Sequence, residues 1–148
     1  MIKAVVFDLY GTLIDSERVL APNAKELLQS LSPDYLLGLS TTSSRWSAES
    51  ILKNFGLLEF IKASTCGDEV SQLKPDPEVF LKTIESLGAL PGETVVLEDT
   101  VNGMRGAKAA GAVVIARKAG HNEHQDFSVA DYVVEDLMDV IGIIKKLS

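Results

Sequence analysis

A chain of 148 residues with 46% hydrophobic and 24% charged residues has the composition of an ordinary globular protein that can bury one sizeable core. Its formal net charge of −7 and pI near 4.8 argue against nucleic acid or an anionic membrane as an electrostatic partner. Because Cys66 is the only cysteine, no apolar stretch approaches a membrane span of ~20 residues, and no signal-peptide pattern is present, we expect one cytoplasmic domain over residues 1–148.

Short apolar runs alternate with longer amphipathic segments, which is the pattern of a parallel sheet with helices on both faces. The predicted strands are Lys3–Leu9, Tyr35–Ser40, Ile61–Ser64, Thr94–Glu98, Ala112–Ala116 and Tyr132–Val134. The predicted helices are Asn23–Ser30, Ser44–Phe55, Pro77–Leu87, Val101–Ala110 and Asp136–Leu147. Three of these helices are expected to end at Gly56, Gly88 and Gly111, and Asp76 is expected to cap the helix that starts at Pro77. The sequence thus predicts an α/β fold with a three-layer, doubly wound parallel sheet.

The first predicted strand ends in an aspartate. Asp8 follows the apolar run Val5–Phe7, and Gly11 and Thr12 come soon after it. A carboxylate at the carboxyl end of a parallel strand lies in the crevice where such sheets bind ligands. A glycine there lets backbone N–H groups turn toward an anion. The alternative interpretation of this segment is an ordinary buried strand that ends in an Asx turn.

Three further polar segments lie where one site would need them. Thr41 and Thr42 follow the second strand, Lys74 precedes a proline-marked helix start, and Glu98 and Asp99 end the Thr94–Glu98 strand. The alternatives are a helix cap for the hydroxyls, a commonplace lysine before proline, and a capping acid pair. Together with Asp8, these residues supply a nucleophile, an anion binder, a cation and a metal-binding acid pair, which suits phosphoryl transfer.

These four motifs, in this order, resemble those of the haloacid dehalogenase (HAD) superfamily. The segment from Glu98 to Gly111 is especially similar to the fourth motif of that family. The resemblance implies the HAD core fold and a hydrolase in which Asp8 attacks phosphorus to form an aspartyl-phosphate. It also implies that the Thr41 hydroxyl and the Thr42 backbone N–H bind a phosphoryl oxygen, with Gly11 and Thr12 beside them. Lys74 would neutralise the charge that Asp8 and the phosphoryl group share.

The carboxylates of the predicted site repel one another, so we expect a bound cation there. Two like charges about 4 Å apart repel by roughly 4 kcal/mol at an effective dielectric of 20, and three carboxylates are expected to converge here. A bound Mg²⁺ relieves this repulsion and suits carboxylate oxygens. The resemblance implies that Asp8, Asp99 and the Tyr10 carbonyl ligate Mg²⁺ directly and that Glu98 assists through water.

The spacing of the motifs leaves no room for a cap domain, which many members of the family insert. The intervals from Thr12 to Thr41 and from Cys66 to Lys74 are both short. We therefore expect a bare core whose site is open unless a second copy of the chain covers it. Trp46, near the mouth, is expected to pack against the protein, and His121 and His124 are expected to lie in a solvated loop.

Tyr10 departs from the pattern of the phosphatases in this family, which usually carry a second aspartate at that position as general acid and base. A phenol with a pKa of about 10 can donate a proton but is a poor base at neutral pH. The string Asp8–Thr12 is itself similar to that of 2-haloacid dehalogenases. A phosphatase acting on a small phosphorylated substrate or a phosphoprotein is favoured over a dehalogenase, because two metal-free acids would repel a haloacid. A catalytically degenerate binding module is the third hypothesis.

Overall fold

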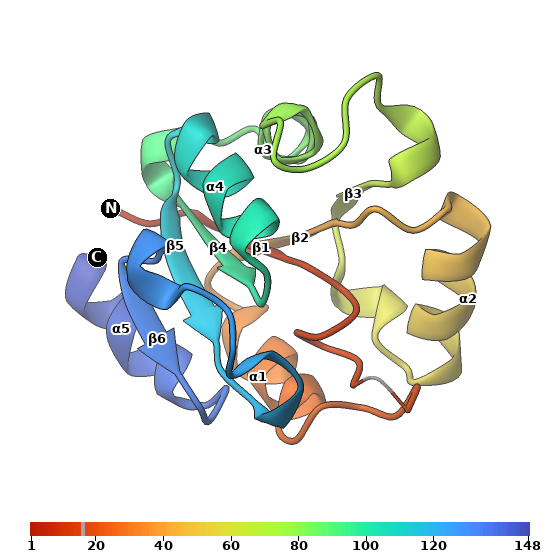
Figure 1. Ribbon diagram of the computed structural model, residues 1–148, viewed down its shortest axis with the longest axis horizontal. Helices are drawn as coiled ribbons and strands as arrows, with labels where there is room; N and C mark the ends of the chain where they lie inside the picture. The colour runs from red at the N-terminus through yellow and green to blue at the C-terminus, as the bar shows by residue number, and fades with distance from the viewer. Residues whose placement is uncertain (16) are drawn as a thin grey trace.

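The computed structural model describes residues 1–15 and 17–148 and contains one six-stranded parallel sheet. The strand order is β3-β2-β1-β4-β5-β6, and Figure 1 shows the sheet between its layers of helices. The strands are β1 (Ala4–Phe7), β2 (Leu36–Ser40), β3 (Ala63–Thr65), β4 (Thr94–Glu98), β5 (Val113–Arg117) and β6 (Tyr132–Val134). The helices are α1 (Ala24–Leu31), α2 (Arg45–Asn54), α3 (Glu78–Ser86), α4 (Val101–Ala110) and α5 (Asp139–Leu147). The predicted strands and helices are therefore confirmed, with ends that shift by a few residues.

Alternating side chains of the central strand feed two separate cores. Val5 and Phe7 point into a core that is completed by α1, α2 and α5. Ala4 and Val6 point into the opposite core, which α3 and α4 complete. A strand buried on both faces needs apolar residues at every position, and β1 reads Ala-Val-Val-Phe for this reason. The predicted three-layer, doubly wound fold is confirmed.

Glycines end three helices, as the sequence predicts. The backbone φ angles at Gly56, Gly88 and Gly111 are +69°, +73° and +93°, a region that other residues rarely adopt. At the start of α3, the carboxylate of Asp76 accepts a hydrogen bond from the backbone N–H of Glu78 at 3.0 Å. The helix begins one residue later than predicted, so its N-cap residue is Pro77. The prediction that Asp76 is the N-cap is therefore wrong, although its carboxylate bonds the first N–H of the helix.

The sheet reverses its winding between β1 and β4. From β1 the chain goes outward to β2 and β3 on one side, and later to β4, β5 and β6 on the other. In such sheets the ligand-binding crevice lies at the carboxyl ends of the two strands where the order reverses. Asp8 directly follows β1, and Glu98 is the last residue of β4, so both acids lie at this point.

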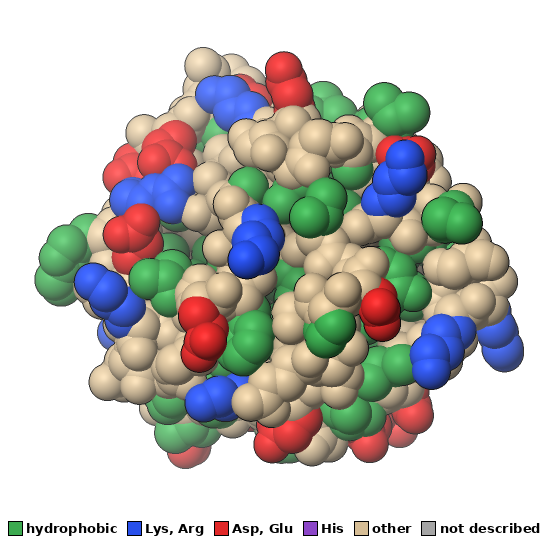
Figure 2. Space-filling view, turned by 180° about the vertical axis from the view of Figure 1, so that it is seen from behind, with side chains coloured by type: hydrophobic (Ala, Val, Ile, Leu, Met, Phe, Trp, Pro, Cys, Tyr) green, Lys and Arg blue, Asp and Glu red, His purple; other side chains and the backbone are tan. Residues whose placement is uncertain are grey.

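The chain between β1 and α1 forms a short flap with no helix or strand among its described residues, 8–15 and 17–23. Two isolated bridges, Tyr10 to Ile14 and Ile14 to Leu20, hold it together. No cap domain is present at this position, as predicted. On the face of the molecule seen in Figure 2, acidic and basic side chains are interspersed. In the part of the chain that the structure describes, no helix is long and apolar enough to cross a membrane.

Candidate active site

The acids at the ends of β1 and β4 lie in a cavity of about 490 Å³. Its lining comprises Asp8, Tyr10, Thr41, Thr42, Lys74, Glu98, Asp99, Thr100, Val101, Asn102 and Gln125. Carboxylate oxygens of the three acids lie within 4.8 Å of one another. Segments that are far apart in the sequence therefore bring one compact carboxylate cluster to the switch point of the sheet.

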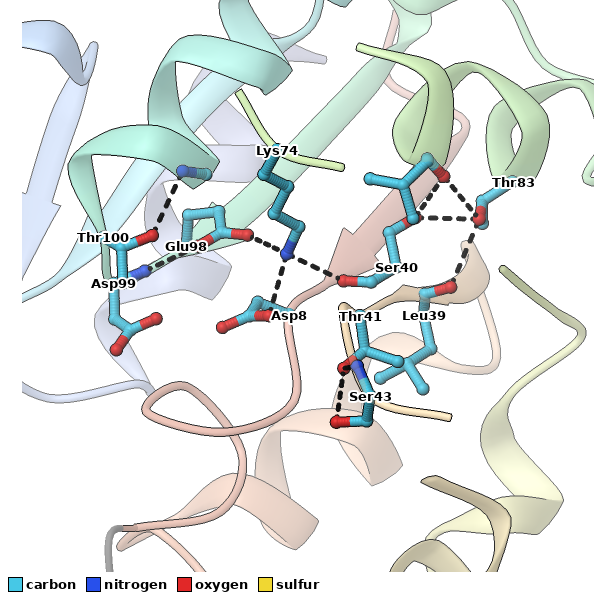
Figure 3. Close-up of polar contacts among 12 residues, drawn as sticks. Asp8, Leu39, Ser40, Thr41, Ser43, Lys74, Thr83, Glu98, Asp99 and Thr100 are labelled. Carbon is cyan, nitrogen blue, oxygen red and sulfur yellow. Dashed lines mark hydrogen bonds and ion pairs between the residues drawn. The ribbon is translucent and has the colours of Figure 1, made fainter. Parts of the chain in front are cut away.

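Lys74 lies between two of these acids. Its Nζ is 2.9 Å from Asp8 Oδ1 and 2.5 Å from Glu98 Oε2, and it also donates to the backbone carbonyl of Ser40 at 3.1 Å (Figure 3). The side chain of Lys74 is only 6% exposed. A buried cation with three acceptors is held in one place, so the ammonium group is preorganised at the cavity wall.

Burial and mutual repulsion set the ionisation of the cluster. Desolvation, reinforced by the Asp8 charge, raises the pKa of Glu98 to about 7 and that of Asp99 to about 9. Burial alone would lower the pKa of Lys74, but the charges of Asp8 and Glu98 outweigh this effect and raise it above its ordinary value. At neutral pH and without a metal, the cluster therefore holds a proton on Asp99 while Lys74 stays charged.

Two glycines allow the carboxylates to lie against the backbone. A Cβ atom on Gly11 would lie 1.8 Å from Asp99 Oδ2, and one on Gly103 would lie 2.0 Å from Glu98 Oε1. Real Cβ atoms essentially never come within 3.0 Å of another heavy atom. The structure thus explains Gly11 as a residue that makes room for an acid.

Asp99 is held by residues that the sequence did not single out. Its backbone carbonyl accepts a hydrogen bond from Asn122 Nδ2 at 2.8 Å, and its Oδ2 lies 3.0 Å from His121 Nε2. His121 lies exposed in a loop, as predicted, but its contact with Asp99 was not predicted. Burial, together with the Arg117 charge, lowers the pKa of His121, so its ring is neutral at pH 7. The second oxygen, Asp99 Oδ1, is buried without a hydrogen-bond partner among the described residues.

The hydroxyl residues after β2, Thr41 and Thr42, also line the cavity. Thr41 Oγ1 accepts a hydrogen bond from the Ser43 backbone N–H at 3.1 Å and lies 3.0 Å from Ser43 Oγ. Ser44, not Thr42, caps α2 through a hydrogen bond from the Ser47 N–H. Thr42 therefore lines the cavity and is not the cap of α2, and Thr41 lines the same cavity with its hydroxyl paired to Ser43 (Figure 3).

Gly11 and Thr12 do not line the cavity. The Gly11 N–H donates to the Ile14 carbonyl at 2.7 Å, and its own carbonyl accepts from Arg117 at 2.9 Å. The Thr12 N–H donates to the Leu9 carbonyl at 3.3 Å, and the Thr12 hydroxyl is fully buried. The expected role of both residues in substrate binding is not supported, because their backbone groups are used to fold the flap.

Tyr10 lines the cavity and also reaches toward α2, where its hydroxyl lies 3.4 Å from Ser47 Oγ. Trp46, on the first turn of α2, is 80% exposed. The expectation that Trp46 packs against the protein is therefore wrong. Its neighbour Arg45 turns away, with its guanidinium bonded to Glu69 and Ser64.

Comparisons with known proteins agree on one family. Residues 19–117 match the family described as haloacid dehalogenase-like hydrolase, a range that includes Thr41, Lys74 and Asp99 but begins after Asp8. Protein CbbY of Rhodobacter capsulatus is 32% identical over 135 residues, which is 86% of this chain and 59% of that protein. The bifunctional riboflavin kinase/FMN phosphatase of Arabidopsis thaliana is 32% identical over 136 residues, which is 90% of this chain and 36% of that protein.

A solved structure extends the likeness to three dimensions. The crystal structure of CbbY from Rhodobacter sphaeroides in complex with phosphate superposes with a TM-score of 0.85 at 21% identity, covering 95% of this chain and 96% of that one. At this level of identity the match shows the fold. The chain spans less than two thirds of the length of the two relatives named above.

Proposed function

The chain belongs to the haloacid dehalogenase-like hydrolases, and from this premise we propose that it is a Mg²⁺-dependent phosphatase that acts on small phosphate monoesters through Asp8. The observation that carries the proposal is the cluster of Asp8, Glu98 and Asp99 with Lys74 in one cavity at the switch point of the sheet. Two of the similar proteins, the riboflavin kinase/FMN phosphatase and CbbY in complex with phosphate, support a phosphorylated substrate.

The residues of the cluster fit a hard divalent cation. All donors are oxygens, and the buried Asp99 Oδ1 has no partner among the described residues, so it is available as a ligand. We assign Asp8, Asp99 and the Tyr10 carbonyl as direct ligands. Both oxygens of Glu98 are already hydrogen-bonded, one to Lys74 and one to the Asp99 N–H, which favours an indirect role for Glu98 through water. When bound, Mg²⁺ would neutralise charge on the transferring phosphoryl group.

In the proposed reaction, a carboxylate oxygen of Asp8 attacks phosphorus and the bond from phosphorus to the ester oxygen breaks. The leaving alkoxide takes a proton from water to become the alcohol, and a second water then hydrolyses the aspartyl-phosphate to inorganic phosphate and restores the Asp8 carboxylate. Thr41 and Thr42 bind the phosphoryl oxygens from one wall of the cavity. Lys74, fixed by Asp8 and Glu98, compensates the negative charge that develops between nucleophile and phosphoryl group.

Tyr10 limits this chemistry. Loss of a general acid and base costs typically ~10²–10⁴-fold in rate, and a tyrosine hydroxyl in place of a carboxylate is a poor base for the attacking water. Good leaving groups need no proton, so p-nitrophenyl phosphate should be cleaved far better than glycerol phosphate. Slow hydrolysis of the aspartyl-phosphate should give a burst of nitrophenol followed by slow turnover.

The test is a burst assay with both esters, in Mg²⁺ and in EDTA. Asp8→Asn should abolish the burst, and Tyr10→Asp should speed steady-state turnover, most of all on glycerol phosphate. If Asp8→Asn retains the burst, the covalent mechanism is wrong. Halide release from 2-chloropropionate without Mg²⁺ would instead support the dehalogenase, and phosphate binding with no turnover would support a binding module.

We further propose that residues 1–148 form one HAD-like core domain that acts in the cytoplasm, where phosphate esters are abundant. The open cavity admits either a small ester or a phosphorylated side chain, and the lack of a cap leaves room for a second copy of the chain. Sedimentation at several protein concentrations would show whether such a homo-oligomer forms.

A further inference from the structure

A second cavity adjoins the first one. It has a volume of about 340 Å³ and lies between the flap and α2. Tyr10 lines both cavities, so the two are neighbours on either side of this residue. A phosphate ester whose phosphorus lies at Asp8 must extend its leaving group out of the first cavity, and the second cavity offers a place for it.

The second cavity has the chemistry of a binding site for a ring. Trp46 lines it and is 80% exposed, which leaves most of a large apolar side chain in water. Ser50 and Asn54, on the same face of α2, add hydrogen-bonding groups. An indole face, a few convergent polar groups and a concave shape are the usual components of a small-molecule site.

The charge of the residues that line the second cavity limits which kind of ring can bind there. A tryptophan face attracts cations as well as neutral rings. Among the described residues that line this cavity, Arg18 is the only charged one, and its guanidinium disfavours a cationic ligand. Arg18 also has a φ of +61°, a region that costs free energy for a residue with a Cβ atom, and such strain concentrates at functional positions.

We propose that this cavity is a subsite for the leaving group of the substrate and that it selects a neutral or anionic planar aromatic ring, which stacks on Trp46. The subsite rests on the proposed function, because the phosphoryl group bound at Asp8 positions the ring. The subsite would provide, from the core domain alone, part of the substrate specificity that a cap domain would otherwise provide.

Two phosphonates that cannot be hydrolysed test the proposal. Phenylphosphonate and methylphosphonate share the anionic group and differ only in the ring. Stacking on Trp46 should make the phenyl compound bind about three- to tenfold more tightly in the presence of Mg²⁺. Trp46 is the only tryptophan of the chain, so shielding of its fluorescence from acrylamide by phenylphosphonate, but not by methylphosphonate, reports the contact directly.

Substitutions of Trp46 separate the contribution of the ligand's ring to binding from that of its phosphonate group. By calorimetry, Trp46→Ala should reduce the phenyl-to-methyl preference to about one and leave methylphosphonate binding unchanged, and Trp46→Phe should retain most of the preference. Tyr132→Ala is the matched control, because Tyr132 is a partly exposed aromatic residue on β6, at the far edge of the sheet from α2. This control should behave as the unaltered protein does.

The outcomes are distinguishable. Equal affinity of the unaltered protein for both phosphonates, or equal loss of both in Trp46→Ala, would overturn the subsite and leave the phosphatase proposal standing. Failure to bind either phosphonate would overturn the phosphoryl site at Asp8 and the subsite with it. An unchanged melting temperature of Trp46→Ala would show that the exposed side chain does not support the fold.

Discussion

Raising the pH from 7 to 9 in EDTA should destabilise the protein, and Asp99 is the reason. Burial and the Asp8 charge raise the pKa of Asp99 to about 9 in the folded protein, whereas the same group in the unfolded chain has its ordinary pKa of 3.8. Between these values the folded state binds more protons than the unfolded state. The resulting stability is therefore present at low pH and is lost as the pH rises through about 9.

The size of the effect follows from proton linkage. One group changes the free energy of unfolding by at most about 1.36 kcal/mol per pH unit, so Asp99 alone accounts for about 2 to 3 kcal/mol between pH 7 and pH 9. For a chain of this length, that corresponds to a fall of about 5 to 10 °C in melting temperature. The pH range from 7 to 9 lies above the range in which His121 titrates. Because the pKa of His121 is lowered, its contribution to stability increases as the pH rises below about pH 7, which is opposite to the effect of Asp99.

Urea unfolding at several pH values in EDTA measures the slope directly. Asp99→Asn is the matched variant, because it keeps the shape of the side chain and removes the titrating group. The variant retains Cys66, whose pKa is raised to about 11 in the folded protein. Ionisation of this thiol lowers stability near pH 9 in both proteins, so the comparison with Asp99→Asn removes its effect. Mg²⁺ should counteract the loss if it binds the ionised carboxylates as we propose, because a ligand of the folded state stabilises that state by mass action. A flat profile in EDTA, or the same slope in Asp99→Asn, would refute this account of the cluster.

Two further substitutions probe the same cluster. Gly103→Ala places a Cβ atom 2.0 Å from the Glu98 carboxylate, so it should lower stability by about 1 to 3 kcal/mol in urea unfolding and weaken Mg²⁺ binding in calorimetry. The control is Gly142→Ala, in open space on α5, which should stabilise the protein by about 0.5 to 1 kcal/mol. Lys74→Met leaves buried acids without their cation and should lower stability by about 3 to 5 kcal/mol at pH 8 in EDTA. The loss of stability should be smaller at pH 5, because the acids take up protons there. An equal loss at both pH values would contradict the ion-pair interpretation.

The sequence predicts the fold well because each element has one dominant signal. Strands buried on both faces read as short apolar runs, and glycines with positive φ end three of the helices. The gathering of Asp8, Glu98 and Asp99 is equally predictable, because carboxyl ends of neighbouring parallel strands meet at one edge of the sheet. Local pattern and sheet geometry were sufficient for these features.

Contacts between loops carry no such signal. His121 lies 22 positions after Asp99 in a segment of turns, and only the folded path of that segment brings its ring to the carboxylate. The Gly-Thr pair after Asp8 looks like an anion-binding turn, yet Gly11 is required for the close approach of Asp99. Trp46 was expected to pack against the protein because most large apolar residues do, but its side chain is 80% exposed.

The charge of the site implies an order of binding. With all three acids ionised, Lys74 leaves two uncompensated negative charges in the cavity, and a phosphate monoester brings about two more at neutral pH. Like charges at this separation repel by several kcal/mol, so the site without a cation would repel the phosphate ester that we propose as substrate. Protons on Asp99 and Glu98 relieve part of this repulsion, but a proton on Asp99 occupies the carboxyl group that would hold the metal. Mg²⁺ binding, with release of protons, should therefore precede the phosphate ester.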